Sequence, residues 1–249
     1  MGGLDRRASV FASLREEDAK GDRLLFIAGP FEFVDHDESQ PDGPANLAIS
    51  LADAYARLGY DMGYLAPREA NWLTKSGVTS LDGWRTASAN VKMTTIRVGQ
   101  DDIGVLFLPM LPAGQEKAPR YMVRSILDKA AKLRERTKLV VAVSPWGYTG
   151  ELAFLTENPP AVDIMLGAGP GPGLAGRFEA EAKTFWVRAY SKGRAVHILR
   201  INEWPDRARK DWHWEREANL VLDFRPLRET VDADADMAQF VREHFPDAR

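Results

Sequence analysis

The chain has 249 residues, of which 45% are hydrophobic and 28% are charged, so it can bury a substantial core as one large domain or two small ones. Its 33 basic and 36 acidic side chains give a formal charge of −3, and without a block of Lys or Arg it is a poor candidate for nucleic-acid binding. The absence of cysteine excludes disulfides, thiolate metal sites and Cys nucleophiles.

The first hundred residues alternate between helix and strand patterns. The clearest helix carries Leu47, Leu51, Tyr55 and Leu58 on one face, and Gly59 follows where a C-terminal cap belongs. The short apolar run at 24–28 is typical of a strand that is buried on both faces. The patterns predict helices over 6–17 and 47–58, strands over 24–28 and 60–65, a loop over 35–44, and a hairpin of 94–98 and 103–108 around 99–102.

The remaining chain continues this alternation. The patterns predict helices over 120–136, 151–155 and 237–244, strands over 139–143, 162–166 and 219–224, and a hairpin of 184–189 and 195–201 joined by 190–194. Strands that alternate with helices, together with hairpins, favour an α/β protein with mixed sheets. Without an internal repeat or a convincing linker, we expect a single domain over residues 1–249.

Five segments, in order and at about the expected spacing, carry a family resemblance. They are Gly2–Ala8 with the helix that follows, Leu24–Gly29, Leu58–Asp61, Val141–Ser144 and Val162–Gly167. Together they resemble the N-terminal domain of the 5′-nucleotidases in the calcineurin-like metallophosphoesterase superfamily. The resemblance implies an α/β/β/α sandwich of two sheets. It also implies phosphate-ester hydrolysis at two metal ions, which Asp, Asn and His side chains hold at the carboxyl ends of strands.

The side chains that bind metal in that family have no counterparts at the aligned positions. The chain begins after the first Asp-x-His motif, so that motif and its strand are missing. The family's bridging Asp aligns with Pro30. Its Gly-Asn-His-Glu motif aligns so that Pro67 stands for the Asn and Arg68 for the catalytic His, ahead of Glu69. The next ligand His aligns with Pro145, and the last two His align with Gly169 and Gly171. Proline and glycine offer a metal no side-chain donor. None of His36, His197, His213 and His244 aligns with a ligand.

The resemblance and its departures together predict a catalytically inactive protein. We expect a metallophosphoesterase-like binding or structural component without a catalytic residue or a cofactor, and without the family's C-terminal nucleotide-recognition domain. The residues expected around the old cleft are Pro30, Arg68, Glu69, Pro145, Trp146, Gly169 and Gly171.

Two alternatives stay open. The acidic segment 35–38 contains Asp35, His36 and Asp37, which with Glu69 could supply relocated ligands for a divalent metal and a metal-dependent phosphoesterase. A solvated acidic loop is the simpler interpretation of that segment. The second alternative is a small-ligand binder that uses the old cleft, with Arg68 and Trp146 at its mouth.

Three further motifs have structural interpretations. The glycine-rich segment 167–173 lacks the Gly-Lys-Ser/Thr ending of a phosphate-binding loop and contains two prolines, so it is typical of a rigid surface turn. The tryptophans at 204, 212 and 214 could form a ligand platform or pack under a hairpin. His197 alternates with apolar neighbours, which favours an edge or cross-strand position.

Partners and location follow from the same observations. A missing interior strand would leave backbone groups unpaired, so we expect a protein partner or a second copy of the chain to cover them. No apolar run is long enough for a membrane span. The segment Met1–Arg7 lacks the apolar core of a signal peptide, which predicts a cytoplasmic protein. A periplasmic location is expected if a leader precedes Met1, because the family is commonly exported.

Overall fold

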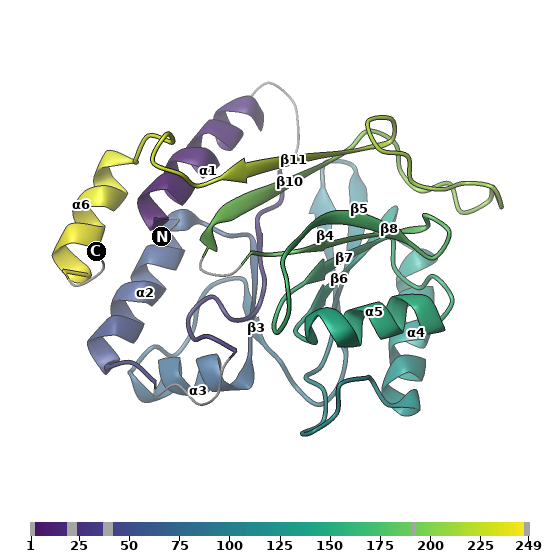
Figure 1. The fold of residues 1–249 in the computed structure, drawn as a ribbon, viewed down its shortest axis with the longest axis horizontal. Coiled ribbons are helices and arrows are strands. Elements are labelled where there is room, and N and C mark those ends of the chain that lie inside the picture. The colour runs from purple at the N-terminus through teal and green to yellow at the C-terminus, as the bar shows by residue number, and fades with distance from the viewer. Residues whose placement is uncertain (1–2, 19–23, 37–41, 191–192, 247–249) are drawn as a thin grey trace. The chain divides into compact units, whose positions relative to one another are not determined.

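The computed structural model describes residues 3–18, 24–36, 42–190 and 193–246. The chain forms two compact units, and Figure 1 shows their elements. The first unit comprises residues 1–86, 191–196 and 226–249, and the second comprises residues 87–190 and 197–225. No helix in the described ranges is long and apolar enough to cross a membrane.

The first unit packs helices around a small parallel sheet. Its helices are α1 (Leu4–Asp18), α2 (Ala45–Leu58), α3 (Pro67–Lys75) and α6 (Ala235–His244), and its strands β1 (Ile27–Ala28), β2 (Met62–Leu65) and β3 (Trp84–Thr86) lie in the order β1-β2-β3. Helices α1, α2 and α6 contact one another (Figure 1). Gly59 ends α2 with φ of 68°, as predicted. Gly63 is required on β2, because a Cβ there would lie 2.0 Å from the Trp84 indole.

The second unit is built on a six-stranded mixed sheet. Its elements are β4 (Lys92–Val98), β5 (Asp101–Phe107), α4 (Arg120–Arg134), β6 (Leu139–Ser144), α5 (Gly147–Glu157), β7 (Ile164–Gly167), β8 (Leu174–Glu179) and β9 (Thr184–Arg188). The order is β4-β5-β6-β7-β9-β8, with β5, β6, β7 and β9 parallel and the outer strands antiparallel. The carboxyl ends of four parallel strands therefore share one edge of the sheet.

One core cluster fills the face of this sheet that α4 and α5 cover. Leu133 of α4, Phe154 of α5 and Trp186 of β9 belong to it and are almost fully buried. Strand β6 is buried along its whole length, which fits its continuous apolar run in a parallel sheet.

The predicted hairpin of 184–189 and 195–201 is wrong. Strand β9 lies between β7 and β8, so both of its edges are already paired, and β10 (Ala195–Ile201) pairs instead with β11 (Leu220–Pro226). The strand predicted over 24–28 is shorter in the structure, where β1 holds only its last two residues. The other predicted helices and strands form close to their expected bounds, whereas α3, β3 and β8 have no counterpart in the predictions.

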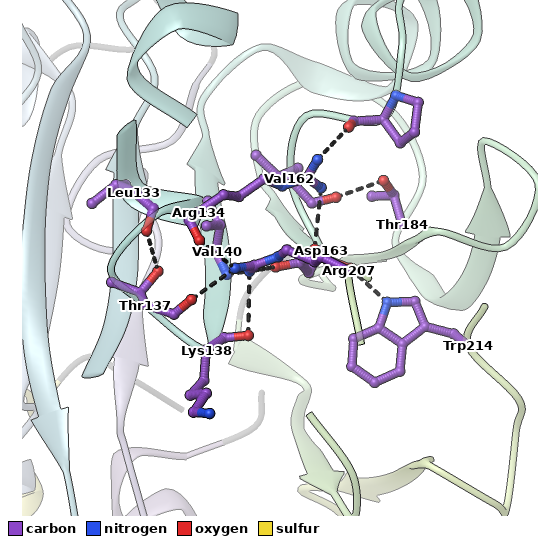
Figure 2. Close-up of polar contacts among 11 residues, drawn as sticks. Leu133, Arg134, Thr137, Lys138, Val140, Val162, Asp163, Thr184, Arg207 and Trp214 are labelled. Atoms are coloured by element: carbon purple, nitrogen blue, oxygen red, sulfur yellow. Dashed lines mark hydrogen bonds and ion pairs between the residues drawn. The ribbon is translucent and has the colours of Figure 1, made fainter. Parts of the chain in front are cut away.

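A buried aspartate anchors the long connection between β10 and β11 to the start of the parallel strands. The Asp163 carboxylate pairs with Arg134 at 3.1 Å and Arg207 at 2.7 Å, and it accepts the Val140 N–H at 2.7 Å (Figure 2). Arg207 also donates to the carbonyls of residues 134, 137 and 138. The Trp214 indole donates to the Asp163 carbonyl at 3.0 Å. These bonds fix the connection on the sheet edge opposite the carboxyl ends.

Candidate functional site

The candidate residues lie in two groups, one in each unit, and both groups follow the carboxyl ends of parallel strands. In the first unit, Pro30 comes two residues after β1, and Arg68 and Glu69 lie in the first turn of α3, just after β2. In the second unit, Pro145 and Trp146 follow β6, and the turn that contains Gly169 and Gly171 follows β7. In the first unit a side-chain carboxylate binds the backbone of its group, whereas in the second unit backbone–backbone hydrogen bonds join the group.

In the first unit, Glu69 organises the loop after β1. Its buried carboxylate accepts the backbone N–H groups of Phe31 at 2.9 Å, Phe33 at 2.8 Å and Val34 at 3.5 Å. It also accepts the N–H of Ala66, the residue before α3, at 2.7 Å. Phe31 has φ of 72°, a conformation that non-glycine residues rarely adopt, so the loop is held in a strained turn around the carboxylate.

Burial decides the protonation of this carboxyl group. It raises the pKa of Glu69 to about 7, while the four N–H donors act in the opposite direction. The neighbouring Arg68 does not face it as a free cation, because its Nε pairs with Asp42 at 2.9 Å. Neither side chain is therefore presented as an unpaired group for a ligand.

A second polar cluster ties the same loop to α1. Arg7, which is almost fully buried, donates to the Glu32 carboxylate at 3.0 Å and to the hydroxyls of Tyr55 and Tyr60 at 3.2 and 3.0 Å. Burial raises the pKa of Tyr60 to about 12, so this phenol stays protonated near neutral pH. The loop after β1 is thus fixed through Glu32 as well as through Glu69.

In the second unit, the glycine-rich turn closes against the start of α5. The N–H groups of Gly147 and Tyr148 donate to the carbonyls of Ala168 and Pro170 at 2.9 and 2.8 Å. Gly147 and Gly171 both have positive φ, and a Cβ on Gly147 would lie 2.6 Å from the Pro170 carbonyl oxygen. The turn therefore uses N–H groups of the α5 N-terminus that an anion would need. This geometry agrees with the predicted rigid surface turn and disfavours a phosphate-binding loop.

A buried ion pair supports this turn from below. Arg188, the last residue of β9, pairs with the Glu151 carboxylate of α5, and the two side chains are 1% and 0% exposed. The Trp186 indole donates to the same carboxylate oxygen at 2.8 Å. Burial raises the pKa of Glu151 to about 7, and Arg188 lowers it. The guanidinium also donates to the carbonyls of Gly169 and Pro170, both at 3.0 Å.

Trp146 does not form the mouth of a cleft. Its side chain is buried in the core cluster, and its indole N–H donates to the Pro109 carbonyl at 2.6 Å. The expectation that Arg68 and Trp146 present themselves to a small ligand therefore has no support from their contacts.

The residues present do not fit a two-metal site. Pro30, Pro145, Gly169 and Gly171 have no donor side chain, and both carboxylate oxygens of Glu69 and one oxygen of Glu151 are bound by protein donors. Within the described ranges, no group of three or more His, Asp or Glu residues could hold a metal ion. His36 contacts Asp35 at 2.8 Å as a half-exposed pair, and Asp37 lies outside the described residues.

The tryptophan-rich segment packs against the sheet. Trp212 and Trp214 are buried and contact each other edge to face, with ring centroids 4.7 Å apart. The Trp204 indole donates to Asp101 at 3.2 Å. A hollow of about 290 Å³ lies beside them, lined by Glu203, Arg209, Trp212, His213, Glu215, Ala218 and Asn219. His213 pairs there with Glu215 at 3.1 Å. Packing therefore explains most of the tryptophan surface.

Glu151 and Arg188, which have the most enclosed charges near the candidate residues, were not predicted as site residues from the sequence. Each residue has a sequence context that could have indicated burial. Glu151 is followed in its helix by the apolar run Leu-Ala-Phe-Leu, and Arg188 is the last residue of the buried strand Thr-Phe-Trp-Val-Arg. Charged residues are almost never fully buried unless they are paired, so each one implies a partner. Only the fold reveals that they pair with each other.

Comparisons with solved structures place this fold. Over 100% of its length, the chain matches 47% of the sulfate thiohydrolase SoxB of Thermus thermophilus, with a TM-score of 0.69 and 16% identity. It also matches 53% of a 5′-nucleotidase precursor from Thermus thermophilus (98% of this chain, TM-score 0.66, 16% identity). A putative 5′-nucleotidase from Staphylococcus aureus matches with a TM-score of 0.61 and 14% identity, over 95% of this chain and 52% of that one.

These similarities show the fold. The expected metallophosphoesterase-type α/β fold of the 5′-nucleotidase N-terminal domains is confirmed. The chain spans about half the length of these solved structures. No protein-family model matches the chain, and no curated protein is similar to it in sequence.

Proposed function

We propose that this chain is a non-hydrolytic protein on a 5′-nucleotidase-type fold, and that it acts as a binding or structural component. One observation carries this proposal. The two buried carboxylates beside the aligned ligand positions, Glu69 and Glu151, both serve internal contacts, and the aligned positions themselves hold Pro, Arg and Gly.

Physical chemistry connects that observation to function. Hydrolysis at two metals needs donor atoms that hold the ions and leave a position open for the attacking water. The oxygens of Glu69 face backbone N–H groups, and one oxygen of Glu151 faces a guanidinium and an indole N–H. A metal ion bound by Glu69, or by this oxygen of Glu151, would have to displace these donors and leave them unpaired in a buried place, which is costly.

The deciding experiment combines metal analysis with hydrolysis assays on the purified chain. We expect no stoichiometric Mn, Zn or Fe and no turnover of a phosphate monoester, a phosphodiester or a nucleoside 5′-phosphate. An S-sulfonated thiol belongs in the panel because one structural neighbour is a sulfate thiohydrolase. The Thermus 5′-nucleotidase serves as the positive control. Stoichiometric metal together with chelator-sensitive turnover would overturn the proposal.

A double variant tests the relocated-ligand alternative. If turnover is found, Asp35→Ala with His36→Ala shows whether these two residues of the acidic loop are ligands. Loss of turnover in this variant would support that alternative, whereas unchanged turnover would exclude Asp35 and His36 as ligands.

We further propose that the chain works through a protein partner or a second copy of itself. In support of this, β1 lies at the edge of its three-stranded sheet, and edge strands offer backbone groups for pairing. Light scattering after size exclusion measures the molar mass of the purified chain. A dimer would support the second copy, and a monomer would contradict it.

A further inference from the structure

We propose that Arg188 is a built-in cation: its guanidinium fills an oxygen-lined cage at the carboxyl edge of the six-stranded sheet and orders the turn of residues 168–173 without a metal. This inference deepens the proposed function, and it rests on that function only in taking the fold to work here without metal ions. All the contacts that support it lie within the second unit.

The cage consists of oxygens from two segments of the chain. Arg188 Nε donates to the Pro172 carbonyl at 2.9 Å, and Nη2 donates to the carbonyls of Gly169 and Pro170, both at 3.0 Å. The opposite nitrogen, Nη1, pairs with the Glu151 carboxylate. All three nitrogens of the planar guanidinium are thus used, and its fixed fork of donors matches four acceptors.

The surroundings enclose this cation and balance its charge. Both charged side chains are almost fully buried, and the single carboxylate neutralises the single guanidinium. Gly167 pairs with Arg188 across the strands, and a Cβ on it would lie 2.0 Å from a carboxylate oxygen of Glu151. The absence of a side chain at Gly167 therefore provides the space that the Glu151–Arg188 ion pair occupies.

The composition of the turn at 168–173 favours contact with a cationic donor. Its residues Pro170 and Pro172 have no N–H, and three of its carbonyls point at the guanidinium. Carbonyl and carboxylate oxygens are also the donors that hard metal ions prefer. A tethered guanidinium donates to these three carbonyls and balances the charge of the carboxylate, and it does so as part of the chain.

Chemical rescue tests the proposal. In Arg188→Ala the oxygens lose their cation, and we expect the Tm to fall by about 6–20 °C. Guanidinium chloride at millimolar concentration, far below the molar range that unfolds proteins, is expected to restore a large part of this loss. It should not raise the Tm of the unchanged chain or of the control Arg177→Ala. Arg177 also contacts Trp186, but its side chain is 41% exposed.

A second variant keeps the proposal testable if Arg188→Ala does not fold. Arg188→Lys retains the charge but lacks the fork, so we expect a folded protein in which the amides of residues 168–173 exchange hydrogen faster than in the unchanged chain. Unaltered exchange in this variant would overturn the proposal, and so would a folded Arg188→Ala that guanidinium does not stabilise.

These outcomes are independent of the hydrolysis assays. Metal-dependent turnover would overturn the proposed function and leave guanidinium rescue unaffected. A failed rescue, with metal-free and inactive protein, would overturn the built-in cation and leave the proposed function standing.

Discussion

Glu69 and Glu151 are both buried carboxylates, but different donors bind them. Glu69 accepts four backbone N–H groups, whereas Glu151 faces a guanidinium and an indole N–H. The first arrangement fixes a loop through neutral donors, and the second fixes a turn through a charge. Removing either carboxylate therefore leaves a different set of groups without a partner.

Replacing Glu69 with Ala leaves the N–H groups of the loop after β1 without their acceptor. We expect Glu69→Ala to lower the free energy of unfolding by about 1–3 kcal/mol or more, since each buried donor left unsatisfied is costly. Urea denaturation measures this loss. The control Glu16→Ala removes an exposed glutamate from α1 and should change stability little. Equal effects in the two variants would contradict the structural role of Glu69.

The raised pKa of Glu69 predicts a pH dependence. A carboxyl group with a pKa of 4.5 in the unfolded chain and about 7 in the folded chain binds its proton more tightly when folded. Its contribution is fully present below about pH 4.5 and is lost as the pH rises through 7, a change on the order of 3 kcal/mol. Glu69→Gln, which cannot ionise, should reduce the dependence of the unfolding free energy between about pH 5 and pH 8 and leave the part that Glu151, with its similarly raised pKa, contributes.

His197 changes the free energy of unfolding with pH in the opposite direction to Glu69, so a His197 variant is a control for the sign of the Glu69 effect. Burial lowers its pKa to about 4, so the folded chain favours the neutral ring and loses stability as the pH falls from 6.5 toward 4. His197→Phe keeps an aromatic ring beside Tyr190 and Phe224 and removes this opposing effect. The fall in stability with rising pH should then become steeper. A flatter profile would show that the assignment of sign is wrong.

At the scale of elements, the connection between β10 and β11 depends on one arginine. Arg207→Ala removes the donors to the carbonyls of residues 134, 137 and 138 and one partner of Asp163 (Figure 2). We expect a loss of about 1–3 kcal/mol, since the Arg207 side chain is 27% exposed and water can replace part of its contacts.

Local release of that connection is the specific readout. Amides of residues 203–218 should exchange faster in Arg207→Ala, and trypsin should cleave after Arg209 or Lys210 sooner than in the unchanged chain. The control Arg209→Ala, compared by hydrogen exchange because it removes one of the two cleavage sites, lacks an exposed side chain that lies 3.7 Å from the Asp211 carboxylate. If both variants behave alike, Arg207 does not anchor the connection.

Elements with a regular apolar period could be predicted, and those defined by tertiary pairing could not. Helix α2 was predictable from four apolar residues and a terminal glycine, and the hairpin of β4 and β5 from its turn. Strand β9 was also predictable, but its pairing partners were not. Its partner β8 contains a bulge beside Gly176, and this irregular register interrupts the alternating pattern by which a strand is recognised in a sequence. Neighbouring strands in the sequence were therefore assigned to one hairpin incorrectly.

The candidate site shows the same limit. The absence of donor side chains at Pro30, Pro145, Gly169 and Gly171 can be read from the sequence, and the family resemblance makes these positions candidates. The contact of Glu151 with Arg188 cannot be read from it, because the two residues are 37 positions apart and meet only when α5 and β9 have packed. Local pattern thus identifies the candidate positions, and tertiary structure shows which side chains lie beside them.

For the whole molecule, we expect stability to be independent of metal ions. A ligand that binds only the folded state raises the Tm, and its removal lowers it. Incubation with a chelator, followed by dialysis and calorimetry, should shift the Tm of the purified chain by less than about 1 °C. Added Mn, Zn or Mg should have equally small effects. A large fall after chelation would contradict the structural part of the proposed function.

The tether of Arg188 to β9 has a consequence for the order of folding. The turn at 168–173 precedes its cation in the sequence, so during synthesis it leaves the ribosome first. The carbonyls of Gly169, Pro170 and Pro172 gain the guanidinium only after β9 has aligned beside β7, where Arg188 lies opposite Gly167. A chain interrupted before residue 188 therefore keeps the contacts of this turn with the start of α5 and lacks the contacts with the guanidinium.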